Sequence, residues 1–457
     1  MQYYLKIFGC QMNYSDTERI ETILTKYKMK KAASIEAANL IVFVTCGVRQ
    51  SAENRVYGQI NNLRKKYPKK KIILTGCLAH RKDVQRRLKG KVDLFCEINN
   101  FPKNILKFFQ NSKFKIKNSS CDASLKDYLE IKPHYTNKYT AYVPVMTGCN
   151  NFCSYCVVPY ARGREYSRLA QNILKEAKSL VKKGCKEIVL LGQNVNSYNS
   201  KLQKGEAISF PKLLRLIENL PEKFWITFLT SHPKDMNDEL IKMIAQSKKI
   251  CEYISLPAQS GDNEILRKMN RHYTIAHYKN LIKKIRKAYD SRSHLEWTRG
   301  ETSNRITPAI STDIIVGFPG ETKKQFENTA KLFREMKFDM AYINQYSPRP
   351  ETAAWKLKDN VSKKEKVRRE KFLTEILKKT ALENNKKYIR KVVEVLADNA
   401  VRPHSSLAAR SDRLKYMGHT RTQKKVLFFS NKKIPVGSFV KVKITKAKAF
   451  GLEGELL

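Results

Sequence analysis

The stretch Gly148-Cys149-Asn150-Asn151-Phe152-Cys153-Ser154-Tyr155-Cys156 carries three cysteines at the spacing C-x3-C-x2-C, with an aromatic residue just before the last. Thiolates this close can ligate three irons of a [4Fe–4S] cluster, because a short loop brings three sulfurs around one cube. No fourth cysteine stands nearby in the sequence for the fourth iron. We therefore expect an iron with an open position, which is a place for chemistry rather than for electron relay alone.

A zinc knuckle and a ferredoxin loop are the alternatives to this interpretation. Zinc sites usually pair two C-x2-C units or add histidines at ligand spacing, and the stretch has neither. The bacterial ferredoxin run needs another C-x2 step and a final cysteine before proline, and these are missing too. The spacing therefore favours a cluster with an open iron.

The length and charge of the chain limit what it can be. Its 457 residues suggest two to four domains with substantial cores. Lys and Arg total 89 against 42 Asp and Glu, and the net charge of +47 is far beyond what solubility requires. Such a charge favours a polyanionic partner, most simply a nucleic acid. A genome whose codon use favours lysine is the alternative, and both explanations can hold together.

The sequence also bears on the compartment. No apolar run approaches the roughly twenty residues that a membrane span requires. The first residues, Met1 to Phe8, read as a strand and lack the layout of a signal peptide. Ten cysteines in such a chain favour metal ligation over disulfides. We expect a cytoplasmic protein with no membrane association.

The first hundred residues repeat one pattern three times. Each strand-like run ends two residues before a cysteine: Tyr3–Phe8 before Cys10, Leu40–Val44 before Cys46, and Lys71–Thr75 before Cys77. Helices are predicted between the runs, at Ser15–Tyr27, with Ser15 and Glu18 as a capping pair, and at Gln50–Lys66. This alternation implies a parallel sheet, whose loops past the carboxyl ends of the strands form the binding crevice. The three cysteines should converge there and hold a second cluster, although a lone cysteine after a strand is usually a small buried hydrophobe.

The central region alternates in the same way. Six strand-like runs, each followed by a helical stretch, are Ala141–Met146, Glu187–Leu191, Trp225–Thr230, Tyr253–Leu256, Thr312–Val316 and Met340–Tyr346. Six βα units of this kind predict an open partial barrel. The cysteine loop follows the first strand, at the carboxyl end where βα enzymes place their active sites.

The predicted fold class is α/β, with three domains. Residues 1–115 form a parallel α/β domain, 135–375 the (βα)6 partial barrel, and 386–457 a small antiparallel β-barrel, because strand-like runs there are broken by Gly418, Gly437 and Gly451. The tail is basic and carries four aromatic residues suited to base stacking, Tyr416, Phe428, Phe429 and Phe450. The alternative is that aromatics fill the barrel interior, and we expect this of at least one of Phe428 and Phe429.

Several blocks carry a resemblance to a known family over nearly the full length. They are Gly9-Cys10-Gln11-Met12-Asn13-Tyr14-Ser15-Asp16-Thr17-Glu18, Thr45-Cys46-Gly47-Val48-Arg49, Gly76-Cys77, Gly148 to Arg168, Leu191 to Tyr198, Thr230-Ser231-His232-Pro233, Leu256 to Gly261 and Ser347-Pro348-Arg349-Pro350. These blocks resemble the radical S-adenosylmethionine (radical SAM) methylthiotransferases. The segment Gly418-His419-Thr420-Arg421-Thr422 is similar to part of a TRAM RNA-binding domain.

The resemblance implies the cofactors and the residues that hold them. It implies two [4Fe–4S] clusters, with S-adenosylmethionine as both radical source and methyl donor. One cluster, at the catalytic Cys149, Cys153 and Cys156, would bind S-adenosylmethionine, and the other, at Cys10, Cys46 and Cys77, would supply the sulfur. The remaining cofactor contacts that it implies are Tyr155, Gln193, Asn194, Ser231, Gln259, Gly317 and Gly320.

The resemblance also implies a substrate and partners. The segment Gln11-Met12-Asn13 after the first cysteine is most similar to that of family members that methylthiolate carbon 2 of N(6)-dimethylallyladenosine at position 37 of tRNA. Methylthiolation of threonylcarbamoyladenosine in tRNA, or of ribosomal protein S12, are the alternatives within the family. An RNA-binding protein with structural or redox-sensing clusters is the alternative outside it. The expected partners are the anticodon stem-loop of tRNA and an electron donor such as flavodoxin or ferredoxin, with the protein a monomer.

The sequence departs from the family pattern in places. Val44 stands where the family usually has Asn, Glu351 follows Pro350 where the family favours glycine, and Ser291 to Pro308 looks like an insertion. None of these changes removes a predicted cluster ligand. The four cysteines outside the two triads are expected to be small packing residues, and they are Cys96, Cys121, Cys185 and Cys251.

Overall fold

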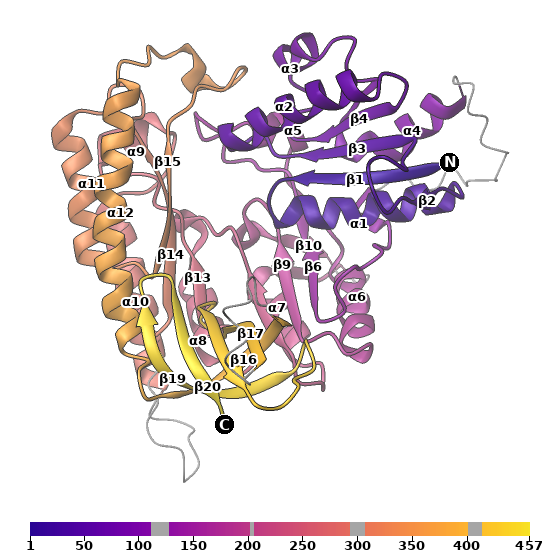
Figure 1. Ribbon diagram of the computed structural model, residues 1–457. Coiled ribbons are helices and arrows are strands. Elements are labelled where there is room, and N and C mark those ends of the chain that lie inside the picture. Colours follow the sequence, from indigo (N-terminus) through magenta and orange to yellow (C-terminus); the bar gives the residue numbers. More distant parts are fainter. Residues whose placement is uncertain (111–127, 202–204, 293–306, 401–413) are drawn as a thin grey trace, which may run out of the picture.

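The computed structural model describes residues 1–110, 128–201, 205–292, 307–400 and 414–457 (Figure 1). Cys121 and most of the predicted insertion at Ser291–Pro308 lie outside these residues. The predicted limits of the three domains, 1–115, 135–375 and 386–457, stay a prediction.

The first domain is a five-stranded sheet with helices on both sides, in the strand order β2-β1-β3-β4-β5. Every strand pair in it is parallel, as the alternation of strands and helices predicted. Its elements are β1 (Gln2–Phe8), α1 (Gln11–Lys26), β2 (Lys30–Lys31), β3 (Leu40–Thr45), α2 (Gln50–Lys66), β4 (Lys71–Gly76), α3 (Lys82–Arg87), β5 (Leu94–Cys96) and α4 (Phe101–Gln110). β3 is buried along its whole length, because helices cover both faces of the sheet.

The start of α1 differs from the prediction. The helix begins four residues before Ser15, and Cys10 is its N-cap. Asn13 closes a capping box there, since its Oδ1 accepts a hydrogen bond from the Cys10 backbone N–H at 3.1 Å. Ser15 and Glu18, the predicted capping pair, therefore lie inside the helix. The prediction was wrong because cysteine is not among the usual capping residues.

The central domain contains the six predicted strands in sequence order. They form two parallel sheets, β12-β9-β6 and β13-β14-β15. A parallel bridge between Ile226 of β12 and Ile250, just before β13, joins the two sheets into one open barrel wall. The strands are β6 (Thr140–Pro144), β9 (Glu187–Leu191), β12 (Trp225–Phe228), β13 (Tyr253–Ser255), β14 (Ala309–Val316) and β15 (Met340–Gln345).

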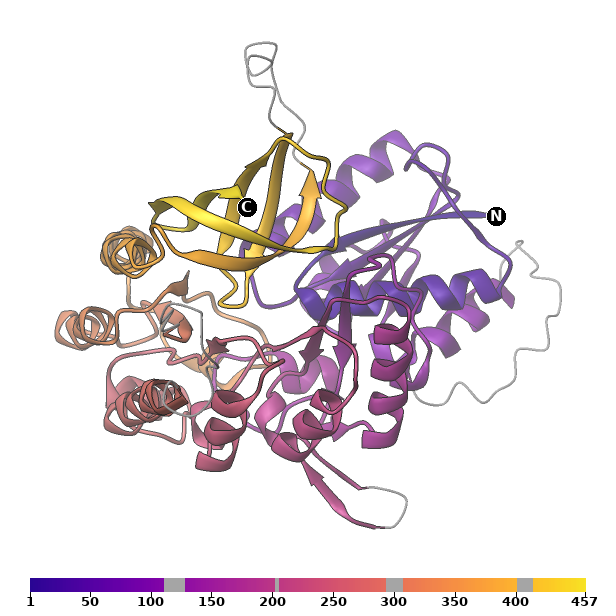
Figure 2. The same cartoon turned by 90° about the horizontal axis from the view of Figure 1, so that it is seen from below.

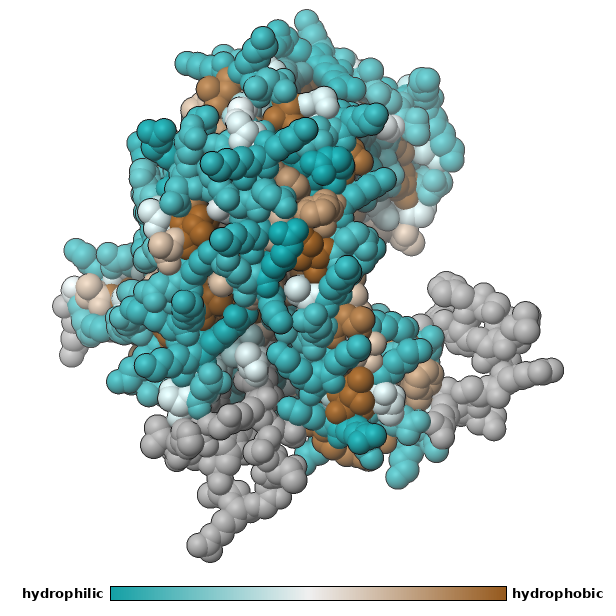
Figure 3. Space-filling view, turned by 90° about the vertical axis from the view of Figure 1, so that its left-hand side faces the viewer, coloured by the Kyte–Doolittle hydropathy of each residue, from teal (hydrophilic) through white to brown (hydrophobic). Residues whose placement is uncertain are grey.

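Helices cover the outside of this wall, and their inner faces form the largest core cluster of the molecule. The six main ones are α6 (Ala170–Lys182), α7 (Phe210–Glu218), α8 (Asp238–Gln246), α10 (Ile275–Arg292), α11 (Lys323–Met336) and α12 (Lys363–Lys386). Shorter elements lie in the loops: β7 (Met146–Thr147), α5 (Val158–Arg162), β8 (Tyr166–Ser167), β10 (Asn199–Lys201), β11 (Ala207–Ser209) and α9 (Asn263–Lys268). The side of the molecule that α11 and α12 form in Figure 1 shows mainly hydrophilic side chains (Figure 3). No helix of the described residues is long and apolar enough to cross a membrane.

The tail is a closed barrel in the strand order β16-β17-β18-β20-β19. Its strands are β16 (Val392–Ala400), β17 (Leu414–Thr420), β18 (Lys425–Ser430), β19 (Phe439–Lys448) and β20 (Gly451–Leu456). The prediction of a purely antiparallel barrel needs one correction, because β18 and β20 pair in parallel to close it. Gly418, expected to break a strand, lies within β17, where a Cβ atom would come within 2.3 Å of the Leu396 carbonyl oxygen.

The two outer domains contact opposite ends of the partial barrel (Figures 1 and 2). The first domain contacts loops that follow the strands: Arg349, after β15, donates hydrogen bonds to Glu53 Oε2 at 2.6 Å and to the Val48 carbonyl oxygen at 2.8 Å. The tail contacts residues where strands begin: Arg421 pairs with Glu252, just before β13, at 2.9 Å. The end of the barrel where sequence analysis placed the chemistry therefore faces the first domain.

Candidate functional site

The cysteine loop is closed at its base by a short hairpin. β7 and β8 pair antiparallel, so the chain leaves the barrel wall at Thr147 and returns at Tyr166. Gly148 has φ +76°, and a Cβ atom there would lie 2.0 Å from the Arg164 carbonyl oxygen. Only glycine fits at this position, since the returning strand touches its backbone. The hairpin therefore fixes where Cys149 begins the loop.

A second segment, after α9, holds the far side of the loop. Asn270 Nδ2 donates to the carbonyl oxygens of Asn151 and Phe152, at 3.3 and 3.0 Å. Arg271 Nη1 approaches Cys153 Sγ at 3.6 Å, while its Nη2 donates to the Pro257 carbonyl oxygen at 2.8 Å. The loop is thus tied to the strand-end loop after β13. Sequence analysis missed Asn270 and Arg271, because no local pattern connects them to the cysteines.

The thiols of the loop lie in a partly buried, low-polarity setting. Burial, and next the nearby Cys153, raises the pKa of the Cys156 thiol to about 12. Burial likewise raises the pKa of Cys149, against a hydrogen bond that Asn151 Nδ2 donates to its sulfur at 3.5 Å. These sulfurs ionise readily only with a cation to stabilise the thiolates, and iron supplies such a charge.

The cysteines of the first domain lie at one edge of its sheet. The backbone N–H groups of Cys46 and Cys77 extend the ladders, donating to the carbonyl oxygens of Phe8 and Thr45 at 2.8 and 2.9 Å. The side chains of Cys10 and Cys46 are hydrogen-bonded to each other, which is the main reason that the pKa of Cys10 is lowered to about 6. The same contact, with burial and the charge of Cys77, raises the pKa of Cys46. The structure therefore brings the three cysteines together, as the topology predicted.

The two cysteine triads face each other across the domain contact. Arg162, at the end of α5, donates to Asp16 Oδ2 of α1 at 2.6 Å, and both side chains are buried. The electrostatic neighbours of this guanidinium, after Asp16, include Cys77 and Cys10. Cys77 is also close enough to add to the upward shift of the Cys156 pKa. Sequence analysis quoted Arg162 and Asp16 only as parts of family blocks, without assigning them a role.

The donor set can be tested against the group that it would hold. No three His, Cys, Asp or Glu side chains within the described ranges converge on one metal-ion position. A [4Fe–4S] cluster does not require its ligands to converge on one metal ion, because each thiolate ligates a different iron. Gly47, next to Cys46, also lets the loops after β3 and β4 pack closely: a Cβ on Gly47 would lie 2.9 Å from the Cys77 carbonyl oxygen and 3.3 Å from its Cβ. Both sulfur-only triads therefore fit a cluster.

Three of the predicted cofactor contacts follow the neighbouring strands β9 and β12. Gln193 and Asn194 follow β9, Ser231 follows β12, and the Val195 N–H donates to the Thr230 carbonyl oxygen at 3.1 Å. Among the described residues, Gln193 Oε1, Asn194 Oδ1 and Ser231 Oγ are buried without a hydrogen-bond partner. Buried polar atoms without partners are costly, so these three fit a polar ligand that satisfies them.

Gln259, Gly317 and Gly320 lie in the loops after β13 and β14. Gln259 has φ +67° and exchanges backbone hydrogen bonds with β14, whose Asp313 and Ile315 are 2.8 and 3.0 Å away. The N–H groups of the two glycines already donate to side chains, to Glu321 Oε2 at 2.6 Å for Gly317 and to Asn360 Oδ1 at 2.7 Å for Gly320. Their backbone donors are therefore occupied, and their role as cofactor contacts stays a prediction.

Tyr155 packs toward the same turn. It lies against a small buried cluster that contains Phe318, Met269 and Tyr346. This links the cysteine loop to the loop after β14, although the contact of Tyr155 with a cofactor stays a prediction.

One departure from the family pattern has a backbone explanation. Glu351 has φ +73°, in the left-handed region that favours glycine, which explains why the family favours glycine at this position.

The comparisons with known proteins agree with this arrangement. Residues 2–97 match the Uncharacterized protein family UPF0004, residues 143–333 the Radical SAM superfamily, and residues 386–457 the TRAM domain. The tRNA-2-methylthio-N(6)-dimethylallyladenosine synthase of Clostridium botulinum (strain Langeland) is 39% identical over 99% of this chain and 96% of its own. The chain belongs to the family of tRNA-2-methylthio-N(6)-dimethylallyladenosine synthases.

Other members of this synthase family are similar to the chain at nearly the same identity. The Clostridium novyi synthase is 39% identical and covers 100% of this chain and 96% of its own length, and that of Thermoanaerobacter pseudethanolicus is 38% identical over 100% and 93%. Among solved structures, the radical S-adenosylmethionine methyltransferase TsrM from Kitasatospora setae superposes with a TM-score of 0.50 at 11% identity. It covers 77% of this chain and 76% of its own, so it shares the fold.

The synthase tail presents its family motif to the barrel rather than to solvent. His419 lies in contact with Glu187 at the start of β9, and Lys424 pairs with Asp339, just before β15, at 2.6 Å. Gly437 meets Tyr139, before β6, so closely that a Cβ atom would lie 2.0 Å from that ring. The turn between β17 and β18 is thus part of a domain contact at the strand starts.

The aromatic residues of the tail divide between core and surface. Phe428 and Tyr416 are buried and stack with ring centroids 5.6 Å apart, which confirms the interior role expected of one phenylalanine. Tyr416 is therefore not available for base stacking, whereas Phe450 is 44% exposed.

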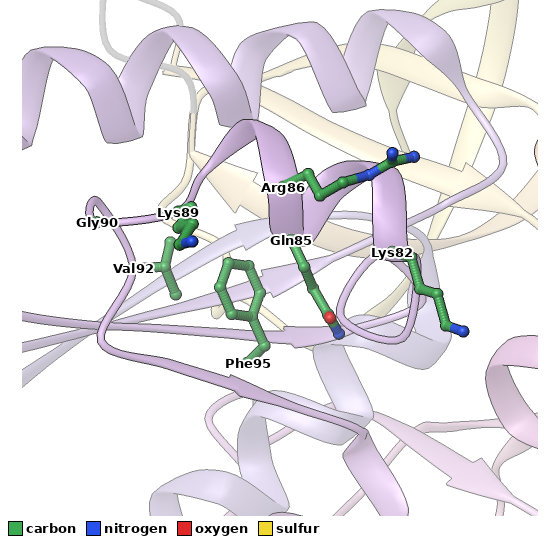
Figure 4. Close-up of a pocket in the computed structure, with 7 residues that line it drawn as sticks. All are labelled: Lys82, Gln85, Arg86, Lys89, Gly90, Val92 and Phe95. Atoms are coloured by element: carbon green, nitrogen blue, oxygen red, sulfur yellow. The ribbon is translucent and has the colours of Figure 1, made fainter.

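Elsewhere in the synthase, a hollow of about 710 Å³ lies between α3 and β5 (Figure 4), away from the predicted site residues. Lys82, Gln85, Arg86, Lys89, Gly90, Val92 and Phe95 line it.

Proposed function

We propose that the protein replaces the hydrogen on carbon 2 of N(6)-dimethylallyladenosine in tRNA with a methylthio group. The observation that carries this proposal is the meeting of two cysteine triads, from two different domains, at facing sheet edges. Near-complete alignment with synthases named for this product supports it. A redox-sensing RNA-binding protein would not require a second triad beside the first.

The chemistry needs cofactors because the substrate offers no acidic proton. Carbon 2 of adenine is an unactivated aromatic C–H, which a positioned acid or base cannot easily replace. When bound, a cluster at Cys149, Cys153 and Cys156 supplies the electron for S-adenosylmethionine cleavage, and a cluster at Cys10, Cys46 and Cys77 supplies the sulfur. The protein's own task is to bind and orient these groups.

Specific side chains perform that task in this proposal. Arg271 and Asn270 hold the cysteine loop in one conformation through contacts to Cys153 Sγ and to two loop carbonyl oxygens. Gln193, Asn194 and Ser231 present buried polar atoms to S-adenosylmethionine. Tyr155 packs between the loop and the turn after β14. Arg349 fastens the first domain over the barrel end and so holds Cys46 opposite the loop.

The substrate must be a base that can leave its stack. A base in an A-form stem hides its edges, whereas a base in the anticodon loop can be splayed out against a protein surface. We therefore assign the reaction to the adenosine at position 37. A net charge of +47 and the TRAM domain support tRNA as the partner. A monomer in the cytoplasm, reduced by a flavodoxin or a ferredoxin, completes the proposal.

The test uses purified, anaerobically reconstituted protein and three tRNA substrates. They carry a dimethylallyl group, a threonylcarbamoyl group or no group at position 37, and digestion followed by mass spectrometry detects the methylthio product. We expect product from the dimethylallyl substrate alone. Equal turnover of unmodified adenosine, or activity only on the threonylcarbamoyl form, would overturn the substrate assignment while leaving the cluster chemistry standing.

A further inference from the structure

The inner wall of the partial barrel carries a carboxylate that the fold leaves without a partner. Along β14, Ile314 and Val316 belong to the core cluster under the helices, so Asp313, which alternates with them, faces the barrel interior. Among the residues that the structure describes, none donates a hydrogen bond to this carboxylate or forms an ion pair with it. Its oxygens remain accessible, whereas Ser311 Oγ on the same face is buried. Asp313 can therefore accept hydrogen bonds from a ligand.

An exposed aromatic ring lies directly across from this carboxylate. In the pairing of β14 with β15, Asp313 is the register partner of Tyr342. Ile343, the next residue, packs against the core under the helices, so Tyr342 also faces the interior. Its side chain is 43% exposed, and the guanidinium of Arg49, from the first domain, lies 5.6 Å from the ring centroid. The ring and the carboxylate thus lie side by side on the wall that the first domain covers.

The rest of the inner wall is closed by apolar packing. Val189 and Leu191, on the inner face of β9, form a buried cluster with Met12 of the first domain. Where the strands begin, Trp225 of the barrel packs with Leu396 of the tail, and both are buried. A polar ligand that enters the barrel therefore finds its acceptor and its flat surface on β14 and β15.

An N(6)-substituted adenine matches this pair of side chains. The only N–H donor on such a base is on its exocyclic nitrogen, because the ring nitrogens are acceptors. Burial raises the pKa of Asp313 to about 6, so the carboxylate is mainly ionised at neutral pH and only accepts. The ring of Tyr342 offers a stacking surface to a base that has left its own stack.

We propose that Asp313 accepts a hydrogen bond from the N(6)–H of the substrate adenosine while Tyr342 stacks on its ring. The inference rests on the proposed function and adds to it the residues that recognise the base. Adenine has two aromatic C–H carbons, at positions 2 and 8. A hydrogen bond at N(6) fixes the rotation of the base in its plane, and so decides which of the two carbons is presented for reaction.

The experiment removes the N–H from the substrate and the carboxylate from the protein, separately and together. Two synthetic anticodon stem-loops carry the dimethylallyl group on position 6 of the purine at position 37, one through nitrogen and one through oxygen. The full-length, reconstituted protein is compared with Asp313→Ala and Asp313→Asn. Binding of each stem-loop is measured at equilibrium, and kcat/KM for the methylthio product is measured by mass spectrometry.

We expect the unaltered protein to prefer the nitrogen form by about 10- to 100-fold, the value of a hydrogen bond to a charged group. Asp313→Ala should abolish this preference, and Asp313→Asn, which keeps an acceptor of the same size, should give an intermediate one. An intrinsic difference in reactivity between the two stem-loops is the same for every variant, so the change in preference isolates the contact.

Two further variants serve as controls. Asp339, just before β15, is a carboxylate with structural partners, the Lys424 ammonium at 2.6 Å and the Ile310 N–H at 3.0 Å. Asp339→Asn should keep the full preference for nitrogen, whatever it does to stability. Tyr342→Leu should weaken binding of both stem-loops alike, by about 5- to 100-fold, because it removes a stacking surface and leaves the acceptor.

The outcomes separate this inference from the proposed function. If Asp313→Ala weakens both stem-loops equally, or instead weakens S-adenosylmethionine binding in the absence of RNA, the inference is wrong. No preference in the unaltered protein overturns it as well, even if Asp313→Ala fails to fold. If the unaltered protein forms no methylthio product from either stem-loop, the proposed function is wrong, and the binding preference still decides the role of Asp313.

Discussion

His419 gives the contact between tail and barrel a pH dependence that can be measured. Its Nδ1 lies 3.0 Å from both carboxylate oxygens of Asp398, and its Nε2 lies 3.3 Å from Glu187 Oε2. Burial lowers the pKa of His419, but the two carboxylates outweigh it and raise the pKa from 6.5 to about 10. The protonated form thus stabilises the folded state fully below the unfolded pKa, and this stability is lost as the pH rises through about 10.

The structure sets the size of this effect. A rise from 6.5 to about 10 would correspond to about 5 kcal/mol, at about 1.36 kcal/mol for each pKa unit. Asp398 is 44% exposed, and the contact of Nε2 with Glu187 lacks hydrogen-bond geometry. Water screens the exposed half of the contact, so we expect about 2–3 kcal/mol.

The assay compares the chain with its His419→Gln variant in urea unfolding between about pH 6 and about pH 10. Trp225 reports on the contact, because its ring centroid is 5.8 Å from that of His419. The difference in unfolding free energy between the two proteins should be about 2–3 kcal/mol at the acid end and vanish at the alkaline end, while other titrating groups cancel. A difference that is independent of pH would refute the reasoning.

Four further outcomes are expected. Replacing Cys10, Cys46 and Cys77 by Ala should reduce iron after reconstitution from about eight to about four atoms per chain, whereas Cys185→Ala and Cys251→Ala should leave it unchanged; full iron in the first variant contradicts the two-cluster assignment. Phe428→Ala should destabilise the tail by about 3–5 kcal/mol in thermal unfolding, because the side chain is fully buried. Lys441→Ala and Lys443→Ala, at exposed positions of β19, should each flatten the salt dependence of tRNA binding by roughly one phosphate contact; an unchanged slope shows that this strand does not contact RNA. Glu351→Gly should stabilise the chain by about 1 kcal/mol in the same thermal assay, because the present residue has φ +73°.

The hydrophobic pattern of the sequence correctly predicted the buried strands, because an apolar run indicates burial directly. β3 and β9 are apolar runs buried on both faces, as parallel strands under helices should be. The rule that strand carboxyl ends share one edge then placed Cys10, Cys46 and Cys77 together without any knowledge of packing. The convergence of these three cysteines could therefore be predicted, because their positions follow from topology alone.

Contacts between distant segments could not be predicted in this way. The parallel pairing of β18 with β20 depends on how the barrel closes, and Gly418 looks like a strand breaker until the Leu396 backbone is placed beside it. Arg271 approaches Cys153 from more than a hundred residues away in sequence, with no spacing to signal it. The prediction of the start of α1 was wrong for a local reason, because Cys10, a cysteine expected to bind a cluster, is also the N-cap of the helix.

The domain order explains how one chain can bring two cysteine triads and a tRNA together. In both α/β units the cysteine-bearing loops lie at the carboxyl ends of the parallel strands. Because these two sheet edges face each other, Cys77 lies near Cys156. Arg349 and Arg162 hold that contact from two sides, through Glu53 and Asp16. The tail docks where the barrel strands begin, through Arg421 and Lys424. It therefore leaves the end where the triads meet free of the tail.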